Sequence, residues 1–580
     1  MQSIMRINCK PLTCLVVIAV FASSPEPSQG TVVEPVRARH AMVVSVHELA
    51  SQAGLEVLRA GGNAIDAAVA TGFALAVVHP QAGNLGGGGF MLIRLADGTA
   101  HFLDYREKAP AAAHAKMYLD RRGQVIENKS LVGYKAVAVP GSVAGMAYAQ
   151  KKWGKLLLAR VMAPAIKLAK EGFALSQLDC EALHDKELAR FPESRRIFQH
   201  DGKFYEPGET LRQPELARTL ERIAANPDDF YHGSLARELA AAIKKGGGLV
   251  TAADLAHYEV KEREPLKGSY RDYQVLTAPL PSSGGIVLLE ALNILEGYYV
   301  AGMGNRTPQF IHMAAESFRR AFYDRAEFLG DPDFTKVPTE GLVSKQYAGA
   351  WRQTSMDAEQ ATPSASLKRP PNFGVTRQRS AVNLRQEPTD TTHYSIVDEA
   401  GNVAAVTTTL NDNFGSRVTA DGLGFLLNDE MDDFTLKAGV PNMYGLVQGA
   451  ANAIGPGKRP LSAMTPTILL KDGKPFLVLG SPGGPRIIST VANIIMGVVD
   501  FRLNIQGAVN APRFHHQWMP DKIYVEKDFS PETVAQLKKR GHTVEEDGQW
   551  SDGECIAIDL KTGDRLGASD IRNNGKAVGY

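Results

Sequence analysis

The chain has 580 residues, with 64 Lys and Arg residues against 63 Asp and Glu residues and 44% hydrophobic residues. This length is sufficient for several domains or for one unusually large α/β unit. The near-zero net charge gives no electrostatic support for binding nucleic acid, and the composition is typical of a globular protein.

The N-terminus has the pattern of a secretory signal peptide. Arg6 and Lys10 precede an apolar run at residues 12–22, and small residues with two prolines follow. The run is short for a bilayer span, and no later stretch approaches twenty uninterrupted apolar residues. We therefore expect a signal peptide at residues 1–30, a mature form outside the membrane, and a periplasmic or secreted location. An uncleaved anchor is the alternative.

Cysteine usage gives no disulfide framework. Cys9 and Cys14 lie in the predicted signal, which leaves Cys180 and Cys555. Two distant thiols could pair in an oxidising compartment. We predict two free or buried thiols instead.

The first 370 residues favour helices around a few strands. Residues 46–60 carry small and apolar residues at helical spacing, which predicts a packed surface helix. Residues 64–78 are apolar on most faces, which predicts a buried helix. Further helices are expected at residues 156–172, 215–245 and 308–328.

Four glycines at residues 86–89 precede an apolar run at residues 90–93. No Lys-Ser/Thr pair follows, as a phosphate-binding loop requires. The pattern therefore predicts a backbone crowded against another element beside a buried strand.

Strands dominate after a polar stretch rich in Pro, Ser and Arg at residues 354–386, which predicts a loop or linker. The linker ends just before the Asp390-Thr391 bond. The expected strands cover residues 394–397, 403–409, 467–470 and 476–479.

The Asp390-Thr391 bond is a candidate cleavage site. If it is hydrolysed, Thr391 gains a free amine that can act as the base for its own hydroxyl. A hairpin that pairs Asp398 with Asn402 places Thr391 opposite Thr409, and facing residues lie about 4.5–5.5 Å apart. A slip of one residue would abolish this pairing. The alternative is that the threonines simply favour a strand.

Gly483 and Gly484 lie between the strand at residues 476–479 and a helix-like run at residues 487–499. Backbone N–H groups at a helix start attract negative charge, so the two glycines could form an oxyanion hole. A plain strand-to-helix turn would explain the same residues.

An acidic cluster occupies residues 428–434 and lacks the ligand spacing of a calcium hand. It either receives a substrate ammonium group or forms a solvated turn. His515 and His516 are adjacent and have no further His or Cys spacing beside them, so we expect a structural role and no metal.

These segments together resemble the γ-glutamyltranspeptidases, a family of N-terminal-nucleophile hydrolases. The similarity extends from about residue 38 to residue 580. Its most specific pieces are residues 391–395, 428–434, 458–462, 480–484 and 512–516.

The resemblance implies a four-layer αββα sandwich and a precursor that cuts itself at Asp390-Thr391. The large subunit (residues 31–390) and the small subunit (residues 391–580) would remain together as a heterodimer in one folded unit. The nucleophile would attack γ-glutamyl compounds such as glutathione and pass the acyl group to water or to an amino acid or peptide amine. No cofactor is implied.

The resemblance also assigns roles to individual residues. They are Thr391 as nucleophile, Thr409 as the hydroxyl that orients it, Gly483 and Gly484 as oxyanion donors, Arg106 for the α-carboxylate, Asn411, Glu430 and Asp433 for the α-ammonium, Ser462 as one of two neighbouring serines, and Tyr444 as part of a lid.

The chain departs from this pattern at Ala463, which replaces the second serine and removes a hydroxyl worth about 1 kcal/mol. An acylase for glutaryl or poly-γ-glutamyl amides is the alternative within the same fold. A glutaryl group lacks the α-ammonium, so Glu430 and Asp433 favour the glutamyl substrate. A non-enzymatic binding protein is the alternative outside enzymes.

Overall fold

The computed structural model describes residues 33–200, 202–371 and 391–580. The predicted signal peptide, Asp390 and much of the predicted linker lie outside the described residues. Residues 34–580 form one unit, and the layers described below belong to it.

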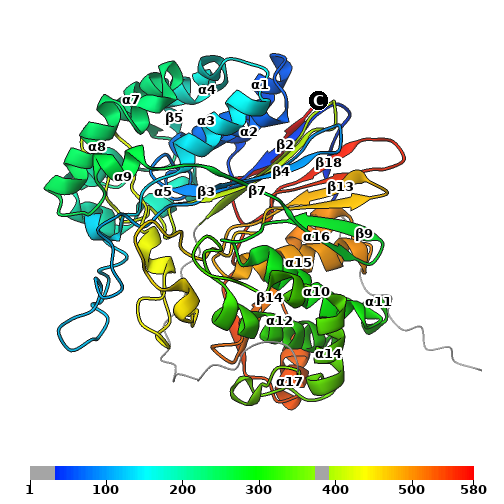
Figure 1. The fold of residues 1–580 in the computed structure, drawn as a ribbon. Coiled ribbons are helices and arrows are strands. Elements are labelled where there is room, and N and C mark those ends of the chain that lie inside the picture. The colour runs from blue at the N-terminus through cyan, green and yellow to red at the C-terminus, as the bar shows by residue number, and fades with distance from the viewer. Residues whose placement is uncertain (1–32, 201, 372–390) are drawn as a thin grey trace, which may run out of the picture. The chain divides into compact units, whose positions relative to one another are not determined.

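Two seven-stranded sheets, each with antiparallel neighbours throughout, form the centre of this unit (Figure 1). The first sheet contains, in spatial order, β19 (Lys576–Gly579), β2 (Met42–Ser45), β10 (Thr392–Val397), β11 (Val403–Thr409), β3 (Gly88–Arg94), β4 (Ala100–Tyr105) and β7 (Lys261–Arg263). The second contains β1 (Val36–Ala38), β18 (Arg565–Ala568), β17 (Cys555–Ile558), β13 (Lys474–Leu479), β12 (Thr467–Lys471), β9 (Tyr273–Thr277) and β8 (Leu266–Tyr270).

Strand residues alternate between two hydrophobic cores. Val44 and Leu92 belong to the core that includes Val478 of the second sheet. Their neighbours Val43 and Met91 belong to a separate core with the helices on the outer face of the first sheet. Because successive strand residues point to opposite faces, the first sheet is covered on both sides.

Helices form the outer layers (Figure 1). On the first sheet lie α1 (Glu48–Arg59), α2 (Ala64–Val78) and α3 (Ser142–Trp153), with α4 (Leu158–Glu171) packed behind α2. On the other side, α10 (Gly284–Glu296) contacts β8 and packs against α12 (Pro308–Phe328) and α15 (Arg486–Val499), while α16 (Ile505–Asn510) contacts β17 and β18. The expected four-layer αββα sandwich is therefore confirmed.

The remaining elements are short or peripheral. They are α5 (Gln177–Leu183), α6 (Pro192–Phe198), α7 (Pro214–Ala225), α8 (Ser234–Lys245), α9 (Ala252–Ala256), α11 (Val300–Met303), α13 (Thr339–Leu342), α14 (Lys345–Ser355), α17 (Pro531–Lys539), and the strands β5 (Phe173–Ala174), β6 (Thr210–Leu211), β14 (Phe514–His515), β15 (Ile523–Glu526) and β16 (Val544–Asp547).

Several predicted elements match closely. The helices expected at residues 64–78 and 308–328 are α2 and α12, and every residue of α2 is buried. The single helix expected at residues 215–245 is wrong, because Pro227 and Gly233 separate α7 from α8. Proline lacks the backbone donor that a continuing helix needs.

The glycine run is crowded as predicted. A Cβ atom on Gly86 would lie 2.2 Å from the carbonyl oxygen of Leu426, and one on Gly87 would lie 2.1 Å from that of Thr409. Both distances are far below van der Waals contact, so only glycine allows the segment before β3 to approach Leu426 and the end of β11 this closely.

Two further predictions concern thiols and membrane spans. Cys180 and Cys555 are buried free thiols, as expected. Within the described ranges, none of the helices combines the length and apolar character needed to cross a bilayer.

Candidate active site

The predicted hairpin is confirmed with its register. Thr392 faces Thr408 and Val397 faces Val403, and the Asp398 amide donates to the Asn402 carbonyl at the turn. One position beyond the ladder, the Oγ1 atoms of Thr391 and Thr409 lie 3.3 Å apart. The two hydroxyls are therefore within hydrogen-bonding distance.

One cleft brings together nine of the ten residues to which the sequence assigned a catalytic or binding role. They are Arg106, Thr391, Thr409, Asn411, Glu430, Asp433, Tyr444, Ser462 and Gly484. Gly483 precedes Gly484 and does not line the cleft itself. Ala463 and a residue without a predicted role, Arg325, are also part of the wall.

Gly483 and Gly484 form the turn between β13 and α15. Their φ angles are 122° and 52°, in the region that favours glycine. A Cβ on Gly484 would lie 2.7 Å from the ring of Tyr444, and one on Gly483 would lie 2.1 Å from Oγ of Ser551. Among the residues that the structure describes, neither amide has a hydrogen-bond acceptor. The turn thus offers two N–H groups at the start of a helix.

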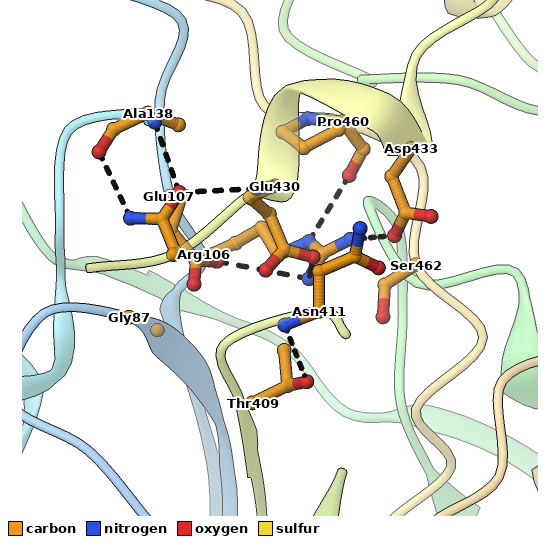
Figure 2. Close-up of polar contacts among 12 residues, drawn as sticks. Gly87, Arg106, Glu107, Ala138, Thr409, Asn411, Glu430, Asp433, Pro460 and Ser462 are labelled. Atoms are coloured by element: carbon orange, nitrogen blue, oxygen red, sulfur yellow. Dashed lines mark hydrogen bonds and ion pairs between the residues drawn. The ribbon is translucent and has the colours of Figure 1, made fainter. Parts of the chain in front are cut away.

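Arg106 follows directly after β4 and is 1% exposed. Figure 2 shows its guanidinium group between the carboxylates of Glu430 and Asp433, with which it forms ion pairs. Its Nε atom donates to the carbonyl of Pro460 at 3.2 Å. The charge of Arg106 is therefore matched by carboxylates of the chain itself.

The acidic cluster is buried, so a solvated turn is the wrong alternative. Glu430 is 0% and Asp433 is 8% exposed, in a 3-10 helix at Glu430–Asp433. Burial raises the pKa of Glu430 well above its usual range and raises that of Asp433, while Arg106 opposes both shifts. Burial also raises the pKa of the neighbouring Glu107 to about 7. Three carboxyl groups thus surround one guanidinium, and burial holds the pKa values of all three above their usual range.

Asn411 and Tyr444 are held together beside the threonine pair. The Tyr444 hydroxyl lies 2.8 Å from the carbonyl oxygen of Asn411 and 2.9 Å from its Oδ1 atom. The Asn411 amide donates to Thr409 Oγ1 at 2.9 Å (Figure 2). A series of hydrogen bonds thus connects the Tyr444 hydroxyl, through Asn411, to the Thr409 hydroxyl.

The backbone at Ser462 is held by a hydrogen-bonded pair, Arg325 and Ser283, that the sequence did not predict. Nε of Arg325, on α12, donates to Oγ of Ser283 at 2.9 Å, and this hydroxyl donates to the Ser462 carbonyl at 2.6 Å. Helical periodicity predicts α12 but does not indicate which of its buried charges faces a cleft.

Two groups of histidines have side chains of the type that binds metal ions. His515 is buried and bonds Ser489 Oγ at 2.9 Å and Gln517 Oε1 at 2.8 Å, which fits the expected structural role. His312, Glu316 and His542 cluster elsewhere. Glu316 pairs with Arg319 at 3.0 Å and with Arg320 at 2.7 Å, and these cations make the cluster a poor site for a metal ion.

Comparison with known proteins matches residues 50–580 to the family model for γ-glutamyltranspeptidase. The chain belongs to this family. The glutathione hydrolase proenzyme of Pseudomonas sp. (strain A14) is 48% identical over 566 residues, which cover 94% of this chain and 95% of that protein.

Two solved structures support the fold. A cephalosporin acylase from Bacillus halodurans superposes with a TM-score of 0.81 at 30% identity, over 97% of this chain and 99% of that one. A Helicobacter pylori γ-glutamyltranspeptidase chain has a TM-score of 0.56 at 41% identity and covers 61% of this chain and 100% of its own.

Proposed function

We propose that the chain is a self-processing γ-glutamyltranspeptidase and glutathione hydrolase. Hydrolysis of the Asp390-Thr391 bond creates the catalyst, and Thr391 then attacks the side-chain amide of glutathione and other γ-glutamyl compounds. The observation that carries this proposal is the threonine pair at 3.3 Å in a cleft that also contains Arg106 and Asp433.

The two ends of the cleft suit the two ends of a γ-glutamyl group. The carboxyl groups of Glu430 and Asp433, with the Asn411 side chain, receive the α-ammonium, and the Arg106 guanidinium offers a planar fork to the α-carboxylate. Ser462 lies on the same wall. The chain of methylenes then extends toward Thr391.

The reaction needs no group beyond those of the chain and water. The free α-amine of Thr391 takes the proton from Oγ1, and Oγ1 attacks the γ-carbonyl carbon. Gly483 and Gly484 offer N–H groups to the developing oxyanion. The leaving amine takes the proton, and an ester remains on Thr391 until water or an acceptor amine attacks it and regenerates the hydroxyl.

The subunit arrangement belongs to the same proposal. Residues 31–390 and 391–580 form the large and small subunits of a heterodimer. The solved Helicobacter pylori chain matches this chain along its whole length yet covers 61% of it, about the share expected for the large subunit alone. The apolar run at residues 12–22 supports secretion to the periplasm or the medium.

The second candidate is an acylase for glutaryl or poly-γ-glutamyl amides, and the superposition on cephalosporin acylase is the observation that favours it. Two observations favour the glutamyl substrate. The glutathione hydrolase relative is more similar, at 48% against 30% identity. Moreover, Glu430 and Asp433 would have no cationic partner on a glutaryl group.

Intact-mass analysis of the secreted protein, combined with turnover of γ-glutamyl and glutaryl anilides, tests the proposal. We expect two chains that meet at the Asp390-Thr391 bond, faster release from the γ-glutamyl anilide, and a single inactive chain for Thr391→Ala. A Thr391→Ala chain that is still cut at this bond would refute self-processing, and a preference for glutaryl would favour the acylase.

A further inference from the structure

Arg325 is a buried guanidinium group without a carboxylate partner among the described residues. It is 2% exposed and lies in the last turn of α12. Its Nε atom donates to Ser283, but its NH1 group is buried and has no hydrogen-bond acceptor. In the described part of the chain, no carboxylate lies within ion-pair distance of it.

The other arginines of the same helix behave differently. Arg319 and Arg320 both pair with Glu316 at 3.0 and 2.7 Å. A buried cation that lacks a partner loses its hydration without compensation. Burial accordingly lowers the pKa of Arg325 to about 10, although Asp433 opposes the shift from a greater distance. The charge of Arg325 is therefore not compensated by any carboxylate of the described residues, and an anion bound in the cleft would supply this compensation.

The cleft determines where this anion lies. Arg325 lines the wall that also contains Ser462, Ala463 and Asp433, and Thr391 lines the same cleft. Arg106 is already bound to Glu430 and Asp433, so Arg325 is the cation at this end whose charge remains unmatched.

We propose that Arg325 binds the α-carboxylate of the γ-glutamyl group together with Arg106, as a specificity-determining residue for the reaction. This inference rests on the proposed function for the identity of the substrate. The α-ammonium lies beside Asp433, and the α-carboxylate turns toward Arg325. The arrangement provides the α-carboxylate with a charged donor on a wall where Ala463 offers no hydroxyl.

Three anilide substrates distinguish a role of Arg325 in binding the substrate carboxylate from a role in stabilising the cleft wall. The γ-glutamyl anilide carries both α-groups, the glutaryl anilide lacks the ammonium, and the 4-aminobutyryl anilide lacks the carboxylate. For Arg325→Gln we expect kcat/KM to fall about 30-fold or more with the first two substrates. With the 4-aminobutyryl anilide we expect little change.

The matched control is Ser283→Ala, which removes the acceptor of Nε and the bond to the Ser462 carbonyl but keeps the charge of Arg325. It should affect all three anilides by a similar factor. If Arg325→Gln also reduces all three equally, or reduces none, the proposal is wrong. Arg325→Lys should retain part of the preference for the carboxylate, because it keeps the charge but lacks the planar fork.

Calorimetric titration keeps the test independent of turnover. We expect L-glutamate to bind Arg325→Gln about 30-fold or more weakly than wild type, and 4-aminobutanoate to bind both alike. Glutamate that binds both proteins equally, or neither, would overturn the inference. Failure of the proposed function would instead show as a wild-type protein that releases no aniline from the γ-glutamyl anilide.

Discussion

The Oγ1 atoms of Thr391 and Thr409 lie 3.3 Å apart, one position beyond the last paired residues of the β10–β11 hairpin. The amide of Asn411 donates to the same Thr409 oxygen at 2.9 Å. Thr409 Oγ1 thus accepts a backbone proton and lies within hydrogen-bonding distance of the Thr391 hydroxyl. We propose that this arrangement orients the Thr391 hydroxyl for attack.

Removal of the second hydroxyl is therefore expected to slow both processing and turnover. For Thr409→Ala we predict a fall in kcat of about 10²-fold per cleaved chain, the scale that misplacement of a reacting group produces. Thr409→Ser should remain within a few-fold of wild type. Aniline release and a denaturing gel measure the two effects.

The adjacent Thr408→Ala variant is the matched control. The Thr408 hydroxyl donates to the carbonyl of Gly88 at 2.7 Å and does not line the cleft. Its loss should cost about 1 kcal/mol of stability and leave kcat nearly unchanged. Wild-type turnover by Thr409→Ala would contradict the assigned role.

The buried carboxyl cluster predicts a pH-dependent stability. The pKa values of Glu107 and Glu430 are raised by burial, to about 7 for Glu107. An acid whose pKa is higher in the folded state binds its proton more tightly there. The contribution of this cluster to the free energy of unfolding therefore decreases as the pH rises from 4.5, the usual value, through about 7.

Glu430→Gln is expected to weaken this dependence, because glutamine resembles the protonated acid and cannot ionise. Thermal unfolding of wild type and variant, measured from pH 4.5 to alkaline pH, should show that the Tm of the variant increases relative to that of wild type as the pH rises. Glu340→Gln, an exposed position in α13, is the control and should follow wild type. A Tm difference between Glu430→Gln and wild type that stays constant across this interval would contradict the prediction.

Local patterns predict the hairpin well, because a short turn fixes which residues face each other and one register suffices to place Thr391 opposite Thr409. They do not predict the Arg106–Asp433 pair, whose members are 327 positions apart in the chain. Only the resemblance to a family brought these two residues together before the structure did.

Burial of charge is the other feature that sequence patterns predict poorly. Acidic residues are rarely buried, so the pattern at residues 428–434 alone favours a solvated turn. Its burial depends on Arg106 from a distant strand end. The position of Arg325 in the cleft could not be predicted for the same reason. Its hydrogen-bond partner Ser283, which in turn bonds Ser462, lies outside α12.

Tyr444 is predicted to tighten substrate binding through Asn411. Tyr444→Phe removes the contacts at 2.8 and 2.9 Å to the Asn411 carbonyl and Oδ1. A hydrogen bond of this kind contributes about 0.5–1.5 kcal/mol, so KM for the γ-glutamyl anilide should rise by about 2- to 10-fold.

The control for this change is Tyr118→Phe, which removes a bond of 2.8 Å to the Lys135 carbonyl outside the cleft. It should leave KM unchanged while lowering stability by a similar amount. If both variants raise KM equally, the effect on binding reflects loosened packing rather than the contact with Asn411.

Ala463→Ser is expected to improve binding of the donor. Ala463 is partly exposed on the cleft wall, which gives an added hydroxyl room to reach the substrate α-carboxylate. A neutral hydrogen bond of about 1 kcal/mol corresponds to a roughly 5-fold lower KM for the γ-glutamyl anilide. KM for the 4-aminobutyryl anilide, which has no carboxylate to accept the bond, should stay constant.

The control is Ala463→Gly, which adds no donor and should not lower KM for either anilide. An equal fall in KM for both anilides would show that the serine acts by reshaping the wall, whereas a fall confined to the γ-glutamyl anilide would place the α-carboxylate beside residue 463.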